Sequence, residues 1–359
     1  MIKLFLTGKH AKRTPLSYPA LAPLFARTIR QVARPGQADL YLFAHVSDVA
    51  RAPRAMVEDW RMRRLQGCAP PVVILSEEPF WDTVWGRQPL ARNRLVETDF
   101  GALPVTQLNH HTSSLFDFDR IPYYLLSDHR FANAYGARFK RNAALTPADW
   151  QARFAARPVE LSFMFERRPE SHHNLVWDDG TIIGLCAWRT GLAEICARAG
   201  TPEKPVELLG QSWQGGPTRF EIGNWHRDKL TRLDGRARLM GAFENTHQPN
   251  YLSEKLFDAF ACGSWPLYYA SPGHRLHGMG LPLGSWGNLF GLSPEEAAAR
   301  IGAIRFSPDM FVAYAQAQAT LARLFNDPGA WVNERRRLAR ALKSELEQLV
   351  PRHARQTRD

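Results

Sequence analysis

The chain has 359 residues, of which 45% are hydrophobic and 23% charged, a composition typical of globular proteins and a length that suits two domains. Its longest apolar runs stop well short of the ~20 residues that a membrane-spanning helix needs. Four scattered cysteines without CxxC spacing argue against a disulfide framework or a zinc site and favour a reducing compartment. The formal net charge of +11 indicates an anionic partner, unless the arginine-rich composition merely spreads positive charge over the whole surface.

The first half of the chain alternates short apolar runs with segments of helical spacing. Lys9 and His10 follow the first run directly, so we interpret that run as a buried strand rather than as a signal peptide. Strands are predicted at 2–6, 39–45, 72–75 and 104–108, and helices at 20–32 and 49–65. This alternation predicts βαβ units and a parallel sheet.

The second half repeats the alternation after a polar stretch, containing arginine and proline, at about 138–158. We place the domain boundary in this stretch, which gives an N-terminal domain at 1–155, a C-terminal domain at 156–330 and a terminal segment at 331–359. Strands are predicted at 161–165, 206–209, 238–243 and 265–269, and helices at 189–199, 227–233, from 253 onward, 294–301, 308–324 and 331–349.

Two α/β domains in tandem predict a ligand cleft between them, facing the carboxyl ends of the strands. Such an architecture suits a transferase, a dehydrogenase or a kinase. Neither GxGxxG nor GxxxxGK followed by Ser or Thr occurs in the sequence, so the last two classes lose most of their support. The Asp117-Phe118-Asp119 motif lies in the N-terminal domain, and we interpret it as a loop rather than as a metal site.

The most informative segment runs from Phe243 to Phe260. A predicted strand ends at Phe243, a polar turn follows, and Ser253 is well suited to cap the next helix. Lys255 then falls in the first helical turn, where its charge opposes the helix dipole unless it faces an anion such as phosphate. The alternative interpretation is an ordinary helix start with an exposed lysine.

This segment resembles the signature of the family 10 glycosyltransferases, the α-1,3/1,4-fucosyltransferases. The signature consists of Phe-Glu-Asn, a short polar turn, Tyr, one residue, Thr-Glu-Lys, an apolar helix and a Pro-containing strand. The residues that match it in identity and spacing are Phe243, Glu244, Asn245, Tyr251, Glu254 and Lys255. Ser253 replaces the usual Thr and keeps its hydroxyl, Asn250 replaces Asp or Gly, and Pro266 matches the following strand. About 30 residues carry the resemblance, and the N-terminal half matches only weakly.

The resemblance implies a GT-B fold, with two Rossmann-like domains facing a central cleft, and inverting transfer of fucose from GDP-fucose. The implied donor site comprises Arg189, Glu244, Asn245, Tyr251, Ser253, Glu254 and Lys255. Lys255 and Arg189 would bind the pyrophosphate and stabilise the charge of the departing diphosphate, so no metal and no cofactor besides the donor is expected. Glu254 and Asn245 would bind sugar or ribose hydroxyls, and Tyr251 would line the pocket. Alternatively, Arg189 is a solvated surface residue and Tyr251 only a packing residue.

Inverting transfer also needs a base that removes the proton of the acceptor hydroxyl. Glu77 and Glu78 follow a predicted strand, and Glu77 is the closer match to a Glu-x-Pro segment of animal-type family members. His111 is a third candidate at another strand end, near the position where some bacterial members have a glutamate. The alternatives are a solvated glutamate loop and, for His111, a pocket residue that contacts the acceptor.

The terminal segment combines a basic helix with an apolar face formed by Trp331, Val332, Leu338, Leu342 and Leu346. Such a helix either binds an anionic membrane surface or packs on the protein. By analogy we expect a cytoplasmic enzyme, on the inner face of the membrane, that acts in bacterial surface-polysaccharide or lipopolysaccharide synthesis. The alternatives are another nucleotide-sugar donor, an inactive sugar-nucleotide-binding relative and, least favoured because no recognised motif is present, a nucleic-acid-binding protein.

Overall fold

The computed structural model describes residues 1–214 and 224–350, which form two compact units. The first unit contains Met1–Asp128 and the chain from Trp331 on, and the second contains His129–Ala330. The division therefore falls earlier than the expected boundary at 155, and the terminal helix belongs to the first unit.

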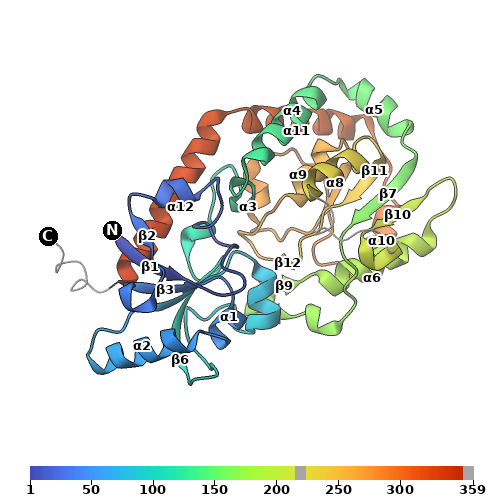
Figure 1. Ribbon diagram of the computed structural model, residues 1–359. Coiled ribbons are helices and arrows are strands. Elements are labelled where there is room, and N and C mark those ends of the chain that lie inside the picture. Colours follow the sequence, from blue (N-terminus) through green and yellow to red (C-terminus); the bar gives the residue numbers. More distant parts are fainter. Residues whose placement is uncertain (215–223, 351–359) are drawn as a thin grey trace. The chain divides into compact units, whose positions relative to one another are not determined.

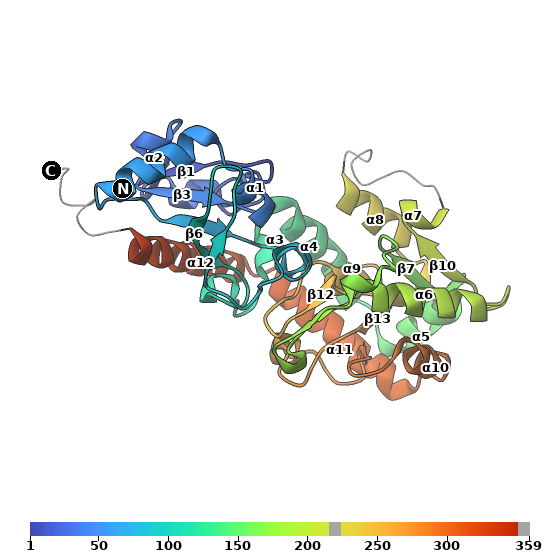
Figure 2. The same ribbon diagram turned by 90° about the horizontal axis from the view of Figure 1, so that it is seen from below.

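The first unit is built on a six-stranded sheet. Its order is β2 (Ile29–Gln31), β1 (Ile2–Leu6), β3 (Leu40–Phe43), β4 (Val72–Leu75), β6 (Leu103–Leu108) and β5 (Asn93–Val96). Every pair is parallel except β5 with β6. Helix α2 (Arg54–Leu65) buries Met56, Val57 and Trp60 against Tyr41 and Phe43 of the sheet, and α12 (Pro328–Leu349) lies on the opposite side (Figure 2).

Of two predicted helices of the first half, one is wrong and the other is divided in two. Residues 20–32 form a 3₁₀ turn at Ala22–Phe25 followed by strand β2, because Ile29 pairs with Ile2 of β1 and tertiary pairing overrides the local pattern. Residues 49–65 form two helices, α1 (Val46–Ala50) and α2, because Pro53 stands at the N-cap of α2 and cannot continue a preceding helix.

The second unit is built on a five-stranded parallel sheet (Figure 1). Its order is β10 (Val206–Leu209), β7 (Val159–Met164), β11 (Ala237–Gly241), β13 (Trp265–Tyr268) and β14 (Gly287–Asn288). A small antiparallel sheet has the order β12 (Thr246–His247), β9 (Ile182–Gly184) and β8 (Val176–Trp177). The helices not yet placed are α3 (Tyr123–Leu126) in the first unit and, in the second, α4 (His129–Ala143), α5 (Pro147–Ala155), α6 (Cys186–Ala199), α7 (Gln211–Gln214), α8 (Trp225–Leu233), α9 (Lys255–Ala261), α10 (Pro294–Gly302) and α11 (Pro308–Phe325).

The polar stretch that we expected to link the domains is helical and belongs to the second unit. Helices α4 and α11 run side by side (Figure 1), and Tyr135 and Phe139 of α4 pack on Phe325 of α11 with ring centroids 5.3 and 4.9 Å apart. The stretch has a polar sequence because charged side chains such as Arg141 and Arg153 are exposed, while its aromatic residues Phe139, Trp150 and Phe154 are buried.

The predicted class, α/β with two Rossmann-like parallel sheets, is confirmed. In the first sheet the chain moves from β1 to β2 on one side and returns to β3 on the other, so the strand order reverses between β1 and β3. The second sheet reverses between β7 and β11 in the same way. Ligands of open α/β sheets bind outside the carboxyl ends of the strands at such points.

The apolar face of the terminal helix is buried within the first unit. Trp331 is 4% exposed, and Leu338, Leu342 and Leu346 are 0% exposed, which leaves Val332 as the only exposed member of the predicted face. The Glu334 carboxylate further accepts the backbone N–H groups of residues 119–121. The apolar side chains that would contact a membrane are therefore buried in the protein itself. Residues 351–359 of the predicted basic tail lie outside the described residues. No helix among the described residues has the length and apolar character needed to cross a bilayer.

A buried ion pair joins the helices beneath the second sheet. The Lys229 ammonium of α8 lies 2.6 Å from the Asp258 carboxylate of α9, with side-chain exposures of 4% and 0%. The hydroxyl of Tyr135 on α4 donates to the other Asp258 oxygen over 2.5 Å. Helices distant in sequence are thereby fixed around one carboxylate.

Replacing this carboxylate by an amide, in Asp258→Asn, leaves the Lys229 ammonium buried without its counter-charge. We expect a loss of about 3–5 kcal/mol of unfolding free energy in urea, the usual cost of breaking a buried pair from one side. The exposed pair Asp228–Arg232 on the same helix α8 supplies the control, because Arg232→Gln should change stability by less than about 1 kcal/mol. Equal, small effects of both substitutions would contradict a structural role for the buried pair.

Candidate functional site

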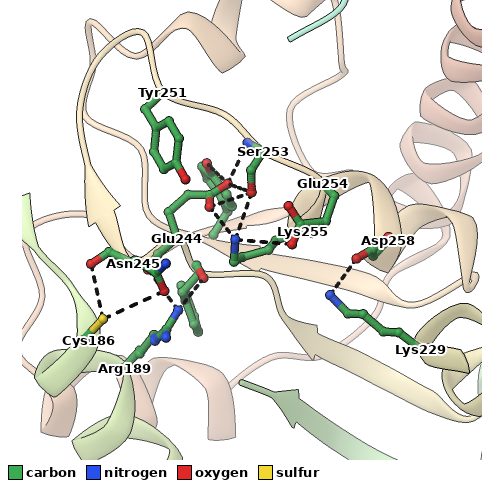
Figure 3. Close-up of polar contacts among 12 residues, drawn as sticks. Cys186, Arg189, Lys229, Glu244, Asn245, Tyr251, Ser253, Glu254, Lys255 and Asp258 are labelled. Carbon is green, nitrogen blue, oxygen red and sulfur yellow. Dashed lines mark hydrogen bonds and ion pairs between the residues drawn. The ribbon is translucent and has the colours of Figure 1, made fainter. Parts of the chain in front are cut away.

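The carboxylate of Glu244 is the centre of the site in the second unit (Figure 3). It follows β11, is 3% exposed, and accepts the backbone N–H of Ser253 over 2.8 Å. The Ser253 hydroxyl contacts both carboxylate oxygens, at 2.8 and 2.7 Å, and the Lys255 ammonium lies 2.9 Å from one of them. One buried acid at the end of a strand thus fixes the start of the next helix.

Ser253 does not have its predicted role as helix cap. The N-cap of α9 is Glu254, without a side-chain cap bond, and Lys255 is the first helical residue. The Ser253 hydroxyl is committed to Glu244 and accepts from the Lys255 ammonium over 2.9 Å instead. The demand of a buried carboxylate for hydrogen bonds outweighs a cap that is worth only about 1 kcal/mol.

Lys255 is held in place between acids. Its ammonium contacts Glu244 and Ser253, lies 3.4 Å from an oxygen of Glu254, and its side chain keeps 18% of its surface exposed. The cation is therefore both fixed in position and accessible to solvent. The structure does not support the alternative of a freely exposed lysine.

Glu254 offers an acceptor oxygen that no described residue uses. The residue is 7% exposed, and its Oε2 atom is buried without a hydrogen-bond partner among the described residues. Burial by itself would raise the pKa of Glu254, but the charges of Lys255, Lys229 and His226 outweigh burial and lower this pKa below its usual range. The group is therefore an anion with one oxygen to spare, which suits a ligand hydroxyl.

Arg189 bridges the two strand ends at the reversal point of the second sheet. Its guanidinium lies 4.5 Å from the ring centroid of Phe165, after β7, and donates to the carbonyls of Phe243 and Glu244, after β11, at 3.1 and 3.3 Å. With 2% exposure it is not the solvated surface arginine of the alternative interpretation. In this structure it organises the loop after β11, and its predicted contact with pyrophosphate stays a prediction.

Asn245 and Tyr251 complete the predicted donor set and come together with it (Figure 3). The Asn245 carbonyl accepts the backbone N–H of Leu185 over 2.9 Å, and the thiol of Cys186 lies 3.6 Å from it. Tyr251 is 4% exposed, and its carbonyl lies 3.1 Å from a ring nitrogen of His274. Their roles toward a sugar or ribose also stay predictions.

Lys229 lies near Glu254 in the structure, and the sequence did not indicate that it belongs to the site. Its charge contributes to the low pKa of Glu254 although it is 26 positions away from Lys255 in the sequence. Its sequence signal is weak, because a lysine in an amphipathic helix is normally exposed, and only the packing of α8 on α9 buries it.

In the first unit, Glu77 is surrounded by donors. Arg13 and Tyr18 each contact its Oε1 at 2.6 Å, and Tyr123 donates to its Oε2 over 2.7 Å, while its side chain is 2% exposed. A carboxylate whose oxygens already accept hydrogen bonds from a guanidinium and two phenols has few lone pairs left for an acceptor hydroxyl. These contacts make Glu77 an anchor for the loop after β1 and a poor general base.

The other two predicted bases are more accessible. Glu78 is half-buried, and His111 is exposed, with its backbone N–H donating to the Asn109 side chain over 2.9 Å. The buried neighbour His110 stacks on Phe116 with ring centroids 4.4 Å apart. The roles of Glu78 and His111 as bases both stay predictions.

A second buried acid, Asp82, lies in a π-helical turn at Trp81–Gly86 that sequence periodicity gave no reason to expect. Asp82 is 4% exposed, and its Oδ2 has no hydrogen-bond partner among the described residues. Burial, reinforced by Glu78, raises its pKa to about 8, although Ser76 and Arg94 act in the opposite direction. Asp82 is therefore an uncharged acid at neutral pH.

Comparisons with known proteins give a likeness of fold only. No protein-family profile and no curated protein matches the sequence. Similar solved structures include an α1,3-fucosyltransferase with GDP-fucose, with 13% identity, a TM-score of 0.42 and coverage of 91% of each chain. Anabaena HepE in complex with UDP has 13% identity and a TM-score of 0.40, covering 96% of this chain and 100% of its own. Likeness at this level assigns no family, donor or acceptor to the chain.

Asp82 predicts a pH dependence of stability. Its pKa in the folded state, about 8, lies above that of the unfolded chain. The contribution of Asp82 to the free energy of unfolding is therefore complete below about pH 4. It is lost as the pH rises toward the folded-state pKa, by up to about 1.4 kcal/mol per pH unit. Asp82→Asn should remove this slope and stabilise the protein at neutral pH.

Urea unfolding at about pH 5 and about pH 7.5 checks this expectation, because both values lie between the two pKa values. Asp99→Asn, at an exposed position of the same unit, is the control for loss of one carboxylate. Identical pH dependence of wild type and Asp82→Asn would show that Asp82 is ionised in the folded state.

Proposed function

We propose that this protein is a nucleotide-sugar-dependent glycosyltransferase of the fucosyltransferase type, which transfers fucose from GDP-fucose to a glycan hydroxyl with inversion. The observation that carries the proposal is the constellation of Glu244, Ser253, Glu254 and Lys255. It combines the resemblance in sequence with a built site beside the reversal point of a parallel sheet.

The arrangement of charges suits a diphosphate and a polyol together. Lys255 presents a cation whose position Glu244 and Ser253 have already fixed, so little side-chain entropy is lost when an anion binds. Glu254 supplies beside it an anionic oxygen that no described residue uses, and anionic acceptors form strong hydrogen bonds with hydroxyl groups. A nucleotide sugar carries both a diphosphate and several hydroxyls.

In the proposed reaction, the acceptor oxygen attacks the anomeric carbon while the bond from that carbon to the diphosphate breaks. Lys255 stabilises the negative charge that develops on the leaving diphosphate, the task for which other transferases use a metal. Arg189 contributes directly or by holding the loop that carries Glu244. A surface polysaccharide or lipopolysaccharide as acceptor, and a cytoplasmic site of action beside the membrane, are further parts of this proposal that rest on analogy.

The second candidate keeps the fold and changes the donor. The resemblance departs from the family pattern at Asn250, where Asp or Gly is usual, and the cationic and anionic groups of the site fit any nucleoside diphosphate sugar. Another nucleotide sugar is therefore the alternative donor, and an inactive relative that only binds sugar nucleotides is the alternative to an enzyme.

Calorimetric titration with GDP tests the donor site. We expect binding by the wild type and at least a tenfold weaker affinity for Lys255→Ala, equivalent to about 1.4 kcal/mol, because one phosphate contact is lost. Lys204→Ala, an exposed lysine of the same unit, is the matched control and should bind as the wild type does. UDP and CMP are titrated in parallel.

Binding of UDP or CMP in place of GDP would replace the proposed donor and keep the site. Absence of binding by all three nucleotides to the folded wild type would refute the proposal. Equal losses in Lys255→Ala and Lys204→Ala would show that the effect is one of overall charge rather than of the site.

A further inference from the structure

A group of histidines and tryptophans lies at the reversal point of the first sheet. His10 follows β1 and His45 follows β3, and their rings stack with centroids 4.7 Å apart. Trp81 lies 5.4 Å from His10 and 5.0 Å from His45, and Trp85, 52% exposed, lies 5.4 Å from His45. Open α/β sheets bind ligands at this position. The residues of the group lie in the N-terminal half of the chain, which shows only a weak resemblance to the family 10 glycosyltransferases.

A buried carboxylate orients His10. Its Nδ1 lies 3.0 Å from Oδ1 of Asp48, and its backbone N–H donates to Oδ2 of the same residue over 2.9 Å. Asp48 has a side-chain exposure of 5%, against 30% for His10. An ionised carboxylate only accepts hydrogen bonds, so it holds the proton of the neutral ring on Nδ1 and leaves the lone pair on Nε2.

The chain makes room for this contact with a glycine. Gly8 has a φ of +104°, and a Cβ there would lie 2.4 Å from Oδ2 of Asp48. Only a residue without a side chain permits both the backbone conformation and the close approach of the carboxylate. The His10–Asp48 pair is therefore built into the loop after β1.

His45 has the opposite tautomer. Its Nδ1 accepts the backbone N–H of Ser47 over 2.9 Å, which places the ring proton on Nε2. Burial, reinforced by the neighbouring His10, lowers its pKa to about 4 although Asp48 acts in the opposite direction. His45 is thus a neutral hydrogen-bond donor, and His10 is the member of the stacked pair whose second nitrogen accepts.

We propose that His10 is the general base of the transfer reaction and that Asp48 is the residue that positions it, an inference that rests on the proposed function. His10 Nε2 takes the proton of the acceptor hydroxyl as the acceptor oxygen forms its bond with the anomeric carbon. The bond from that carbon to the diphosphate breaks, and its electron pair leaves with the nucleoside diphosphate. The aromatic faces of Trp81 and Trp85 would contact the C–H groups of a saccharide acceptor.

The contacts of Glu77 leave it less suited to this role than His10. Glu77 is occupied by Arg13, whose guanidinium also lies 4.9 Å from the ring centroid of Trp81. Among the described groups around the histidines, Asp48 alone is hydrogen-bonded to a ring nitrogen of His10. An imidazole between a carboxylate and a bound hydroxyl is an established arrangement for general base catalysis near neutral pH.

The test measures cleavage of GDP-fucose, and of UDP-glucose if UDP is the nucleotide that binds, with water or azide as the acceptor. Water must lose a proton to react, whereas azide is already an anion and forms the glycosyl azide without a base. We expect His10→Ala to lower water-dependent release of the nucleoside diphosphate by at least about 100-fold, the usual contribution of a general base, and to retain the azide-dependent reaction. His129→Ala, an exposed histidine of the second unit, is the matched control.

Asp48→Asn tests the positioning role without removing the base. The amide oxygen can still accept the His10 backbone N–H, and its NH₂ then faces Nδ1, which forces the ring proton onto Nε2. We expect a similar loss of the water-dependent reaction together with a tautomer change visible in the ¹⁵N NMR signals of His10. A substitution that acted only on stability would leave the tautomer unchanged.

Each outcome separates the two proposals. Water-dependent cleavage within about threefold of wild type in His10→Ala would overturn the assignment of the base and leave the transferase standing. Nucleotide binding without cleavage by the wild type, even with azide, would overturn the base and indicate an inactive relative. A wild type that neither binds nucleotides nor cleaves donors would overturn both proposals.

Discussion

Buried carboxylates are the constraint on which both units depend. Removing a carboxylate from water is costly unless cations and hydrogen-bond donors surround it. Glu244, Asp258 and Glu77 each have a cation and further donors as partners, and Asp48 accepts hydrogen bonds from the ring and the backbone of His10. The contacts of Asp258 fix helices, whereas those of Glu244, Glu77 and Asp48 fix loops that would otherwise have many conformations. These loops lie at the carboxyl ends of the strands, where ligands of such sheets bind.

The number of hydrogen-bond donors around each buried carboxylate separates acids that only stabilise the fold from acids that can take part in chemistry. Glu77 and Glu244 have their oxygens occupied by the protein, which makes them anchors. Glu254 keeps a buried oxygen that has no hydrogen-bond partner among the described residues, and the carboxylate of Asp48 leaves one nitrogen of His10 to accept a proton. Position at the end of a strand is thus not sufficient to identify a catalytic acid or base, because the number of donors around it decides what it can do.

Local patterns predicted elements well where the pattern and the tertiary contacts agree. The strands Ile2–Leu6, Val72–Leu75 and Val206–Leu209 have the expected bounds, since each is a short, mainly apolar run that pairs in a parallel arrangement. The helix expected at 20–32 failed because pairing of β2 with β1 is a long-range interaction that helical spacing does not reveal. The polar stretch at 138–158 was mistaken for a linker because its arginines and prolines mask the buried aromatic residues Phe139, Trp150 and Phe154 of its helices.

The sequence by itself determined the class of fold, the two parallel sheets and the segment that forms the site of the second unit, because alternation of apolar runs and a short contiguous motif are local properties. Only the tertiary structure decided how that segment works, since Glu244 must be buried before it can capture Ser253 and Lys255. It likewise brought His10 to Asp48 across 38 positions, a contact that depends on two neighbouring strands ending at the same edge of a sheet. Neither periodicity nor spacing in the sequence indicates such a long-range contact, because the register of a parallel sheet is set by packing over the whole unit.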